Sequence, residues 1–398
     1  MSNVTLKRLG DLINFKRGYD LPEKDRIIGS YPVISSAGIS GFHNEHKAEG
    51  PGVVTGRYGT LGEMYFVEGK YWPHNTALYV QNFKGNDPKY IYYLLNCLGR
   101  IHTSDKSAVP GVNRNELHEM AIPAIENKEA QIKIRTTLET LDKKIELNNR
   151  INAQLEAMAK TLYDYWFVQF DFPNAKGKPY KTSGGKMVYN AALKRDIPEG
   201  WKGCELGDFI AFKRGISYKS SDIQESGVPF INLNSFSLSG KFKQRGTKYF
   251  NGNFKAGSQL HAGELVIAIT DVTRNADITG KAFVIPNIFE ENPLISCDVA
   301  SITSGVFGVA YLEQLFNSLS YHKYIKHYAS GTLVLHLDLN GVKWFKTVVP
   351  PKDLLEKFEL YCQSLFKQRD ITLQENFRLE SLRDWLLPML MNGQVTVK

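Results

Sequence analysis

The sequence predicts an α+β protein made of two copies of one unit, each a lobe of short strands followed by a long helix. Three observations predict this fold class. The stretch from Lys128 to Phe167 contains no Gly or Pro, and its apolar residues recur every 3.5 residues, which is typical of a coiled coil. Residues 8–18 recur at 205–215 with eight of eleven positions identical. A second long helical stretch follows the second copy, so the chain is a tandem repeat of about 200 residues per copy.

Composition and charge fit this organisation. A length of 398 residues suggests two or three domains, and 42% hydrophobic with 23% charged residues is ordinary for a soluble protein. No signal peptide and no apolar run near membrane length is present, so we expect no membrane span. Four cysteines without C-x-x-C spacing indicate a reducing, cytoplasmic location. A net charge of +8 permits a polyanionic partner but does not require one.

The two lobes are predicted at residues 1–125 and 201–351, each mostly of short β-runs separated by Gly. Strands are predicted in the first lobe at 52–55, 64–67 and 77–80, and in the second lobe at 264–269, 282–285 and 299–302. One amphipathic helix closes each lobe, at 88–99 and at 310–328. Each lobe is long enough to bury one core.

The two long helices are predicted at 126–170 and 352–398, with a Gly-, Pro- and Lys-rich linker at 171–200. About forty helical residues would make a rod of roughly 60 Å. Pro388 and then Asn392-Gly393 are expected to end the second helix. The seam of the helices is predicted to contain Leu138, Leu141, Ile145, Leu155, Leu162, Leu365, Leu379 and Leu386, with either Cys362 or Tyr361.

Polar residues interrupt the seam of both helices. Asn148 and Asn152 lie in the middle of the first seam, and Thr372 and Asn376 lie in the middle of the second. Buried Asn at such positions fixes the register and the number of partners. Alternatively, these residues lie beside the seam and face water, and the sequence leaves both interpretations open.

The region around the first helix resembles the specificity subunit of type I restriction–modification systems. The run LDKKIELNNRINAQLEAMAKTLYDYWF at 141–167 is similar to the central helical region of that family. FDFPN at 170–174, GKPYK at 177–181, GGKMV at 184–188 and IPEGW at 197–201 continue the resemblance. It is sharp over 138–201, weaker over 352–393, and limited to the general plan in the lobes.

The resemblance implies two tandem α/β target recognition domains, separated by two long antiparallel coiled-coil helices and related by a pseudo-two-fold internal repeat. Each domain would read one half of a bipartite, asymmetric site in double-stranded DNA. Two modification (methyltransferase) subunits would dock on the helices, and restriction (translocase and nuclease) subunits would join them. S-adenosylmethionine, ATP and Mg would then bind these partner subunits and not this chain. Half-sites about one turn, or ~34 Å, apart are within reach of rods of roughly 50–60 Å.

Motifs for catalysis are not found in the sequence. Gly184-Gly-Lys-Met lacks the hydroxyl residue of a phosphate-binding loop, and His118-Glu119 lacks the second His of a zinc protease. His43 and His46 could pair on a metal, but we expect them to be solvated or to face DNA. The sequence therefore predicts no catalytic residue and no metal site, and the chain as a non-catalytic subunit.

Two kinds of DNA contact are expected, to phosphates for register and to base edges for sequence. The pairs Lys16-Arg17 and Lys213-Arg214 recur in both lobes, which suits phosphate contacts. Arg57 and Arg274 each follow a hydrophobic strand, where they could bind guanine with about 1–3 kcal/mol of discrimination. The other candidates for base reading are Ser36, Tyr58, Thr60, His74, Asn75, Lys106, Asn234, Thr270, Thr273, Thr332 and His336. For any one of them, the alternative is that it caps a turn or faces solvent.

Two other functions compete with this hypothesis. The chain could be a specificity subunit of a different DNA-methylation or phage-defence complex, or a coiled-coil adaptor whose lobes bind proteins. The basic pI and the Arg and Lys in Gly-rich loops argue against the adaptor. From the residues alone, the prediction is a duplicated two-lobe protein that binds at two places.

Overall fold

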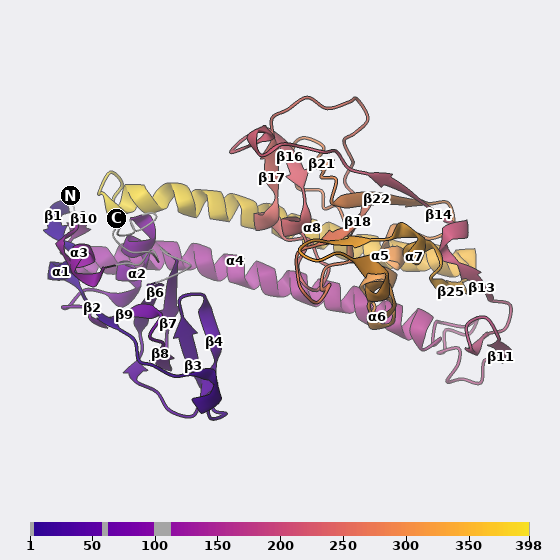
Figure 1. The fold of residues 1–398 in the computed structure, drawn as a ribbon, viewed down its shortest axis with the longest axis horizontal. Helices are drawn as coiled ribbons and strands as arrows, with labels where there is room; N and C mark the ends of the chain where they lie inside the picture. Colours follow the sequence, from indigo (N-terminus) through magenta and orange to yellow (C-terminus); the bar gives the residue numbers. More distant parts are fainter. Residues whose placement is uncertain (1–3, 58–62, 99–112, 398) are drawn as a thin grey trace. The chain divides into compact units, whose positions relative to one another are not determined.

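The computed structural model describes residues 4–57, 63–98 and 113–397 of the 398-residue chain. The chain forms two compact units, one of residues 1–147 and 376–398 and the other of residues 148–375. Each unit contains one lobe together with parts of two long helices, α4 (Lys128–Tyr163) and α8 (Lys352–Met391) (Figure 1). No helix within the described ranges is both long and apolar enough to cross a membrane.

The lobe of the first unit consists of two four-stranded sheets and a short strand pair. The first sheet has the order β2 (Asn14–Arg17), β9 (Ala77–Asn82), β6 (Gly52–Gly56), β7 (Met64–Val67). The second has the order β4 (Gly38–His43), β3 (Tyr31–Ser35), β8 (Lys70–Pro73), β5 (Ala48–Glu49), and β3 and β8 run parallel. The strand pair is β1 (Val4–Arg8) with β10 (Ala121–Ile125), and the short helices are α1 (Leu9–Leu12) and α3 (Arg114–Glu119). The three strands predicted from the sequence are β6, β7 and β9, so these predictions are confirmed.

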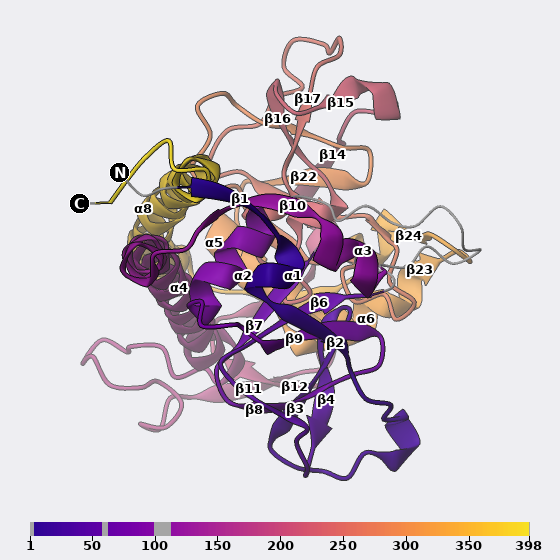
Figure 2. The ribbon, with the colours of Figure 1, turned by 90° about the vertical axis from the view of Figure 1, so that its left-hand side faces the viewer.

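Helix α2 (Pro88–Cys97) joins this lobe to the long helices. It begins at Asp87, whose carboxylate accepts hydrogen bonds from the backbone N–H groups of Lys89 and Tyr90, and Pro88 occupies the first turn. One face of α2 packs on β6 and β7, and its buried residues share a core with Ile134 and Leu138 of α4 and with the end of α8. Figure 2 shows α2 between the sheet and the two long helices.

The lobe of the second unit is built in the same way. Its first sheet has the order β14 (Ile210–Arg214), β22 (Val299–Ser304), β18 (Leu265–Ala268), β20 (Ala282–Val284). Its second sheet contains β15 (Ile223–Gln224), β17 (Lys248–Phe250), β16 (Val228–Ile231) and β21 (Leu294–Ile295), and β16 and β21 run parallel. β13 (Lys202–Glu205) pairs with β25 (Lys346–Val349), and a third sheet has the order β19 (Thr270–Asp271), β24 (Leu335–Leu337), β23 (Ala329–Ser330). The order of the first sheet, the parallel pair of the second sheet and the β13–β25 pair match those of the first lobe and support the internal repeat. The edge strands differ, because β15 pairs with β17 whereas β5 pairs with β8.

The helix predicted at 310–328 is divided in the structure. It consists of α5 (Val309–Asn317) and α6 (Leu319–Ile325), followed by the 3₁₀ turn η7 (Lys326–Tyr328), with α7 (Leu339–Lys343) further along. Ser318 has an extended backbone, and its hydroxyl accepts a hydrogen bond from the N–H of Tyr321. Ser318 therefore starts a new helix as an N-cap residue, which the apolar periodicity did not reveal.

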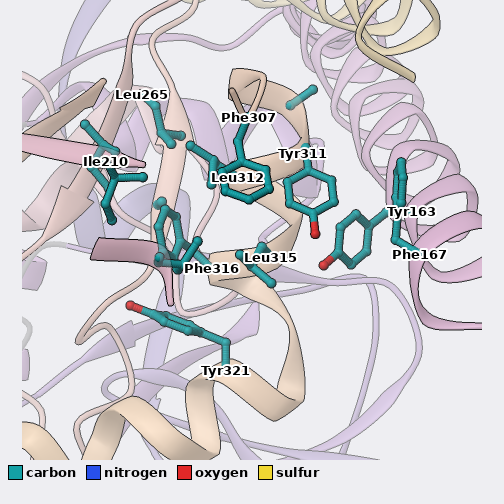
Figure 3. Close-up of a cluster of buried hydrophobic side chains, with 14 of the residues drawn as sticks. Tyr163, Phe167, Ile210, Leu265, Phe307, Tyr311, Leu312, Leu315, Phe316 and Tyr321 are labelled. Atoms are coloured by element: carbon teal, nitrogen blue, oxygen red, sulfur yellow. The ribbon is translucent and has the colours of Figure 1, made fainter. Parts of the chain in front are cut away.

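The core of the second lobe is continuous with the long helices. Figure 3 shows Tyr163 and Phe167 facing Tyr311 and Phe307 of the lobe. The rings of Phe167 and Tyr311 are 4.9 Å apart, and those of Phe307 and Tyr311 are stacked at 5.2 Å. Aromatic pairs of this kind contribute about 0.5–1.5 kcal/mol each beyond the burial of their area.

In the second unit the two long helices run antiparallel. Asn148 donates a hydrogen bond to Glu375, Asn152 accepts one from Thr372, and Tyr163 packs on Phe358, so residue numbers rise on α4 as they fall on α8. In the first unit, Arg383 of α8 donates to Asp142 of α4 at 3.0 Å.

The predicted seam residues are buried to different degrees. Leu138 and Ile145 are buried, and Leu141, Leu155, Leu162, Leu365, Leu379 and Leu386 are half-buried. Cys362 is fully buried whereas Tyr361 is 59% exposed, so Cys362 is the seam residue. Asn148, Asn152, Thr372 and Asn376 are all buried, which decides between the two interpretations of these polar positions in favour of burial.

Pro388 does not end the second helix, because it lies inside α8, but the helix ends at Met391, directly before Asn392-Gly393, the second part of the expected stop. The N–H of Asn392 donates to the carbonyl of Pro388 at 3.0 Å, so the helix continues past the proline. One proline in the last turn removes a single hydrogen bond, a loss that the buried Leu390 and Met391 offset. After α4, a π-helical turn, η2 (Asp164–Val168), extends the first helix through Phe167 as predicted.

The segment predicted as a linker contains secondary structure. Strands β11 (Met187–Asn190) and β12 (Arg195–Pro198) pair as an antiparallel hairpin. Gly177 and Gly184, which suggested a linker, have positive φ in the stretch before this hairpin, and Pro173 and Pro179 pair in a bridge there.

Candidate nucleic-acid interface

In the first lobe, the loop His74–Thr76 brings several of the predicted contact residues together. Arg17, exposed at the end of β2, donates from Nε to the carbonyl oxygen of Asn75 at 3.4 Å. The side chain of Asn75 donates to Asp20 at 2.5 Å. The phosphate candidate and the base-reading candidate therefore lie at the same edge of the lobe.

Thr76 organises this loop, although no pattern in the sequence singles it out. Its hydroxyl accepts the N–H of Ser36 at 3.3 Å and lies 3.0 Å from Nδ1 of His74. Its carbonyl accepts the N–H of Arg57 at 2.9 Å. Three predicted residues are thus linked through one threonine. Burial, and then the positive charge of Arg26, lower the pKa of His74 below its usual 6.5, so the imidazole is neutral at physiological pH.

Lys16 is connected to this loop by Tyr19, a residue that no sequence pattern singled out. Its ammonium donates to the hydroxyl of Tyr19 at 3.1 Å, and that hydroxyl is 3.3 Å from the hydroxyl of Tyr79. These two hydrogen bonds, that of Tyr79 first, lower the pKa of Tyr19. Tyr19 pairs with His74 in a parallel bridge, which fixes the loop against the end of β2.

The second lobe has the same arrangement around the loop Ser296–Asp298. Ile216 pairs with Ser296 in a parallel bridge, as Tyr19 pairs with His74. The N–H of Ile269 donates to the carbonyl of Asp298 at 2.9 Å, as Arg57 does to Thr76. Ser296–Asp298 is therefore the structural equivalent of His74–Thr76. This equivalence is not visible in the sequence, because the two loops share no residue type.

Gly18 and Gly215, which directly follow β2 and β14, are repeated because the backbone of each recognition loop passes close to them. A Cβ on Gly18 would lie 2.1 Å from the carbonyl oxygen of His74, and one on Gly215 would lie 2.2 Å from that of Ser296. Only glycine fits at either position, and the sequence repeat preserves both.

Thr270 lies next to the Ser296–Asp298 loop. Its side chain is buried and donates to the carboxylate of Asp298 at 2.9 Å. On the neighbouring strand, His336 pairs with Thr270 and is exposed, and Thr332 is exposed in the preceding loop. The structure thus brings Thr270, His336 and the missed loop together.

The loop that carries Arg274 is held by a buried carboxylate. Asp271 is fully buried and accepts hydrogen bonds from the N–H groups of Thr273, Ile278 and Thr279, each at 2.7 Å. Burial raises the pKa of Asp271, but the hydrogen bonds, those of Thr273 first, outweigh it and leave the pKa below 3.8. The hydroxyl of Thr273 in turn accepts the N–H of Asp277 at 2.8 Å. Arg274 is exposed on a loop of fixed shape.

The remaining candidates of the second lobe are exposed. The ammonium of Lys213 donates to the carbonyl of Gly257 at 2.5 Å, and Arg214 is exposed at the end of β14. Asn234 is exposed, and its N–H donates to the buried side chain of Asn232. Tyr58, Thr60 and Lys106 lie outside the described residues.

His43 and His46 do not form a pair. His43 is buried against Trp72 and accepts the N–H of Ile27 at 3.1 Å, whereas His46 lies 3.3 Å from Glu49. His43 is therefore neither solvated nor available to DNA, contrary to expectation. Among residues 4–57, 63–98 and 113–397, no group of three or more His, Cys, Asp or Glu is placed to hold a metal ion.

The fold and these loops define a class of protein. Two lobes of similar topology present, at equivalent positions, a loop with polar side chains beside an exposed arginine that ends a strand. Such side chains can hydrogen-bond to base edges and phosphates. The chain has the form of a binding protein with two similar but non-identical recognition surfaces.

The comparisons with known proteins agree on one family. Residues 1–157 match the family model described as the type I restriction modification DNA specificity domain. The chain is 24% identical over 336 residues to the type I restriction enzyme MjaIX specificity subunit of Methanocaldococcus jannaschii, covering 80% of this chain and 73% of that protein. It is 25% identical over 317 residues to the HindI specificity subunit of Haemophilus influenzae, covering 68% of each. The crystal structure of the type I restriction–modification system S subunit from M. genitalium has a TM-score of 0.58 at 18% identity, over 98% of this chain and 96% of that one.

The chain is therefore similar, over 68–80% of its length, to specificity subunits of type I restriction enzymes, and residues 1–157 match the DNA specificity domain of that family.

Proposed function

We propose that this chain is the DNA sequence-recognition subunit of a type I restriction–modification complex and that each lobe reads one half of a bipartite, asymmetric site. One observation carries the proposal. The loops His74–Thr76 and Ser296–Asp298 occupy the same place in both lobes, yet they differ in every side chain. A common frame with different side chains is suited to reading two different half-sites.

Each lobe supplies contacts of two kinds. Arg17 and Arg214, repeated at the ends of equivalent strands, bind phosphates and set the register. Arg57 and the loop around Asn75 read bases in the first half-site, and Arg274 reads them in the second. The long helices α4 and α8 space the lobes.

The modification subunits dock on the helix pair. In the second unit an apolar groove of about 540 Å³ lies between α4 and α8, and Met158, Tyr165 and Tyr361 line it. Met158 and Tyr361 are each more than half exposed. Aromatic residues and Met are enriched in protein interfaces, so this groove fits a protein partner. Tyr361→Asp is expected to abolish co-purification with the modification subunit while the fold persists.

We assign the chemistry to the partners. S-adenosylmethionine, ATP and Mg would bind the modification and restriction subunits, and this chain would contribute recognition without a catalytic group.

The test is a map of methylated adenines in cells that express this chain with the modification gene beside it, compared with cells lacking this chain alone. We expect a bipartite motif with a fixed gap that disappears on deletion. Replacing His74–Thr76 by three alanines should alter one half of the motif. Unchanged methylation after deletion, or a change in both halves after the loop replacement, would contradict the proposal.

A further inference from the structure

Residues 171–202, from just after η2 to Lys202 at the start of β13, form a compact unit that we name the lysine module. The segment extends from the end of the first long helix and contains the hairpin of β11 and β12. Figure 1 shows β11 at the end of α4, next to β13 and β25 of the second lobe. The roles proposed above for the lobes and helices leave this module without a function.

The module is rigidly built. The ring of Phe172 stacks between Tyr180 at 4.6 Å and Trp201 at 5.2 Å. The carboxylate of Asp171 accepts both the N–H and the hydroxyl of Thr182, at 2.7 and 2.6 Å. Asn174 accepts the N–H groups of Lys176 and Lys178, which closes the first turn.

The module is also fixed to the second lobe. Ile197 and Trp201 of the module, and Phe170 directly before it, are buried in the same core cluster as Tyr163 and Ile210. Anything bound by the module is therefore held in a constant position relative to the recognition loops of that lobe.

Positive charge is concentrated in the lysine module. The 32 residues contain six lysines and one arginine against three acidic residues, so they carry half of the chain's net charge of +8. Asp171 is buried and engaged with Thr182, and Glu199 is paired with Lys186 at 2.6 Å.

Three lysines on the two turns of the module are available to a ligand. Lys176, Lys178 and Lys181 are exposed, and within the part of the chain that the structure describes they form no salt bridge. The side chains of Thr182 and Asn174 on the same turns are engaged in holding the backbone, so the turns present these lysines from a fixed support.

We propose that the lysine module binds the phosphate backbone of duplex DNA next to the half-site read by the second lobe. This inference rests on the proposed function. Lysines are depleted from protein interfaces, which favour aromatic residues, Met and Arg, whereas phosphates are bound by exposed point charges. The module thus adds affinity that does not depend on sequence, on one side of the site only.

The test compares two variants of the full chain in its complex with the modification subunit. K176Q/K178Q/K181Q removes three charges, and K176R/K178R/K181R keeps them at the same positions. Binding to a duplex that contains the recognised site is measured from 50 to 200 mM salt. Because each lost phosphate contact reduces the slope of log K against log salt by about 0.9, the Gln variant should lose about 1–3 from the slope and the Arg variant none.

The site of the contact is checked by hydroxyl-radical footprinting. The Gln variant should lose protection beyond the half-site of the second lobe, and its preference for the site over random DNA should stay within twofold of the wild type. All three positions are exposed, so the thermal unfolding of the two variants should coincide.

Two results would overturn the inference. An unchanged slope and footprint in the Gln variant would show that the module does not touch DNA. Loss of the modification subunit from the Gln variant at an unchanged slope would identify the module as a protein-docking surface. Absence of site-specific binding by the wild-type complex would instead contradict the proposed function, so the two failures are distinguishable.

Discussion

Asp271 offers a direct way to separate recognition by the second lobe from its folding. Its carboxylate is fully buried and accepts three N–H groups at 2.7 Å and the hydroxyl of Thr279 at 3.2 Å. Asp271→Asn keeps the shape but leaves one oxygen in place of two. If that oxygen takes the position facing Ile278 and Thr279, the amide NH₂ faces the N–H of Thr273.

The size of the effect follows from that geometry. One hydrogen bond to a charged acceptor, worth about 1.5–3 kcal/mol, is lost, and two donors are left facing each other, so we expect a total cost of roughly 2–4 kcal/mol in local stability. The cost falls on Thr273, the residue before Arg274. The loop should therefore open while the sheet behind it stays folded.

The assay is selection of bound duplexes from random DNA, followed by sequencing. For Asp271→Asn, the half of the motif read by the second lobe should lose at least tenfold in discrimination, and the other half should not change. Asp87→Asn is the matched control. Asp87 is also a buried carboxylate that accepts two backbone N–H groups, but it caps α2, away from the recognition loops. The Asp87→Asn variant should have a lower melting temperature, and neither half of its recognised motif should change.

Two outcomes would refute this reasoning. Unchanged discrimination in Asp271→Asn, together with a lower melting temperature, would mean that Asp271 supports the lobe and not the reading loop. An equal loss in both halves of the motif would contradict the assignment of one half-site to each lobe.

Four further predictions follow. Arg57→Ala should relax recognition in the first half-site only, by about 1–3 kcal/mol, as measured by competition between matched and mismatched duplexes. Lys213→Ala should weaken binding to all sequences and reduce the salt slope by about 1 in the same titration. Asn152→Leu should cost only about 0.5–1.5 kcal/mol in urea unfolding, because the Thr372 hydroxyl loses Asn152 but keeps the carbonyl of Arg369 as an acceptor at 2.8 Å, and Asn152→Leu with Thr372→Val should be no less stable than the single variant. Because the pKa of Asp271 is lowered in the folded chain, its contribution should be fully present above about pH 4 and be lost only as the pH falls through that lowered pKa, a step that Asp271→Asn should lack in acid unfolding.

The helices and strands whose apolar residues recur at a regular spacing were predictable from the sequence. The 3.5-residue seam predicted α4, and the short apolar runs between glycines predicted β6, β9, β18 and β22, because burial of one face imposes these patterns. The end of α8 at Asn392-Gly393 was predicted, but its continuation past Pro388 was not. The burial of Leu390 and Met391, which carries the helix past Pro388, depends on contacts far apart in the sequence.

The recognition loops were predicted only in part, for a physical reason. Arg57 and Arg274 suggested equivalent roles because each follows an apolar strand. The structure makes Ile269 the equivalent of Arg57, since both donate an N–H to the carbonyl at the end of the recognition loop. A parallel bridge between distant segments sets this equivalence, and no local pattern in the sequence encodes such a bridge.

The same bridge explains how the lobes can share a fold and still differ in what they bind. The bridges Tyr19–His74 and Ile216–Ser296, with glycine before each, fix the path of the backbone without using the side chains at the loop tips. Those side chains, His-Asn-Thr in one lobe and Ser-Cys-Asp in the other, are consequently free to vary. Thr76 and Asp298 hold different neighbours, the backbone of Ser36 and the hydroxyl of Thr270. Exchanging the two loops should therefore disturb these supports before it transfers any preference for sequence, and a transfer of specificity would require Thr270 and its neighbours to move with the loop.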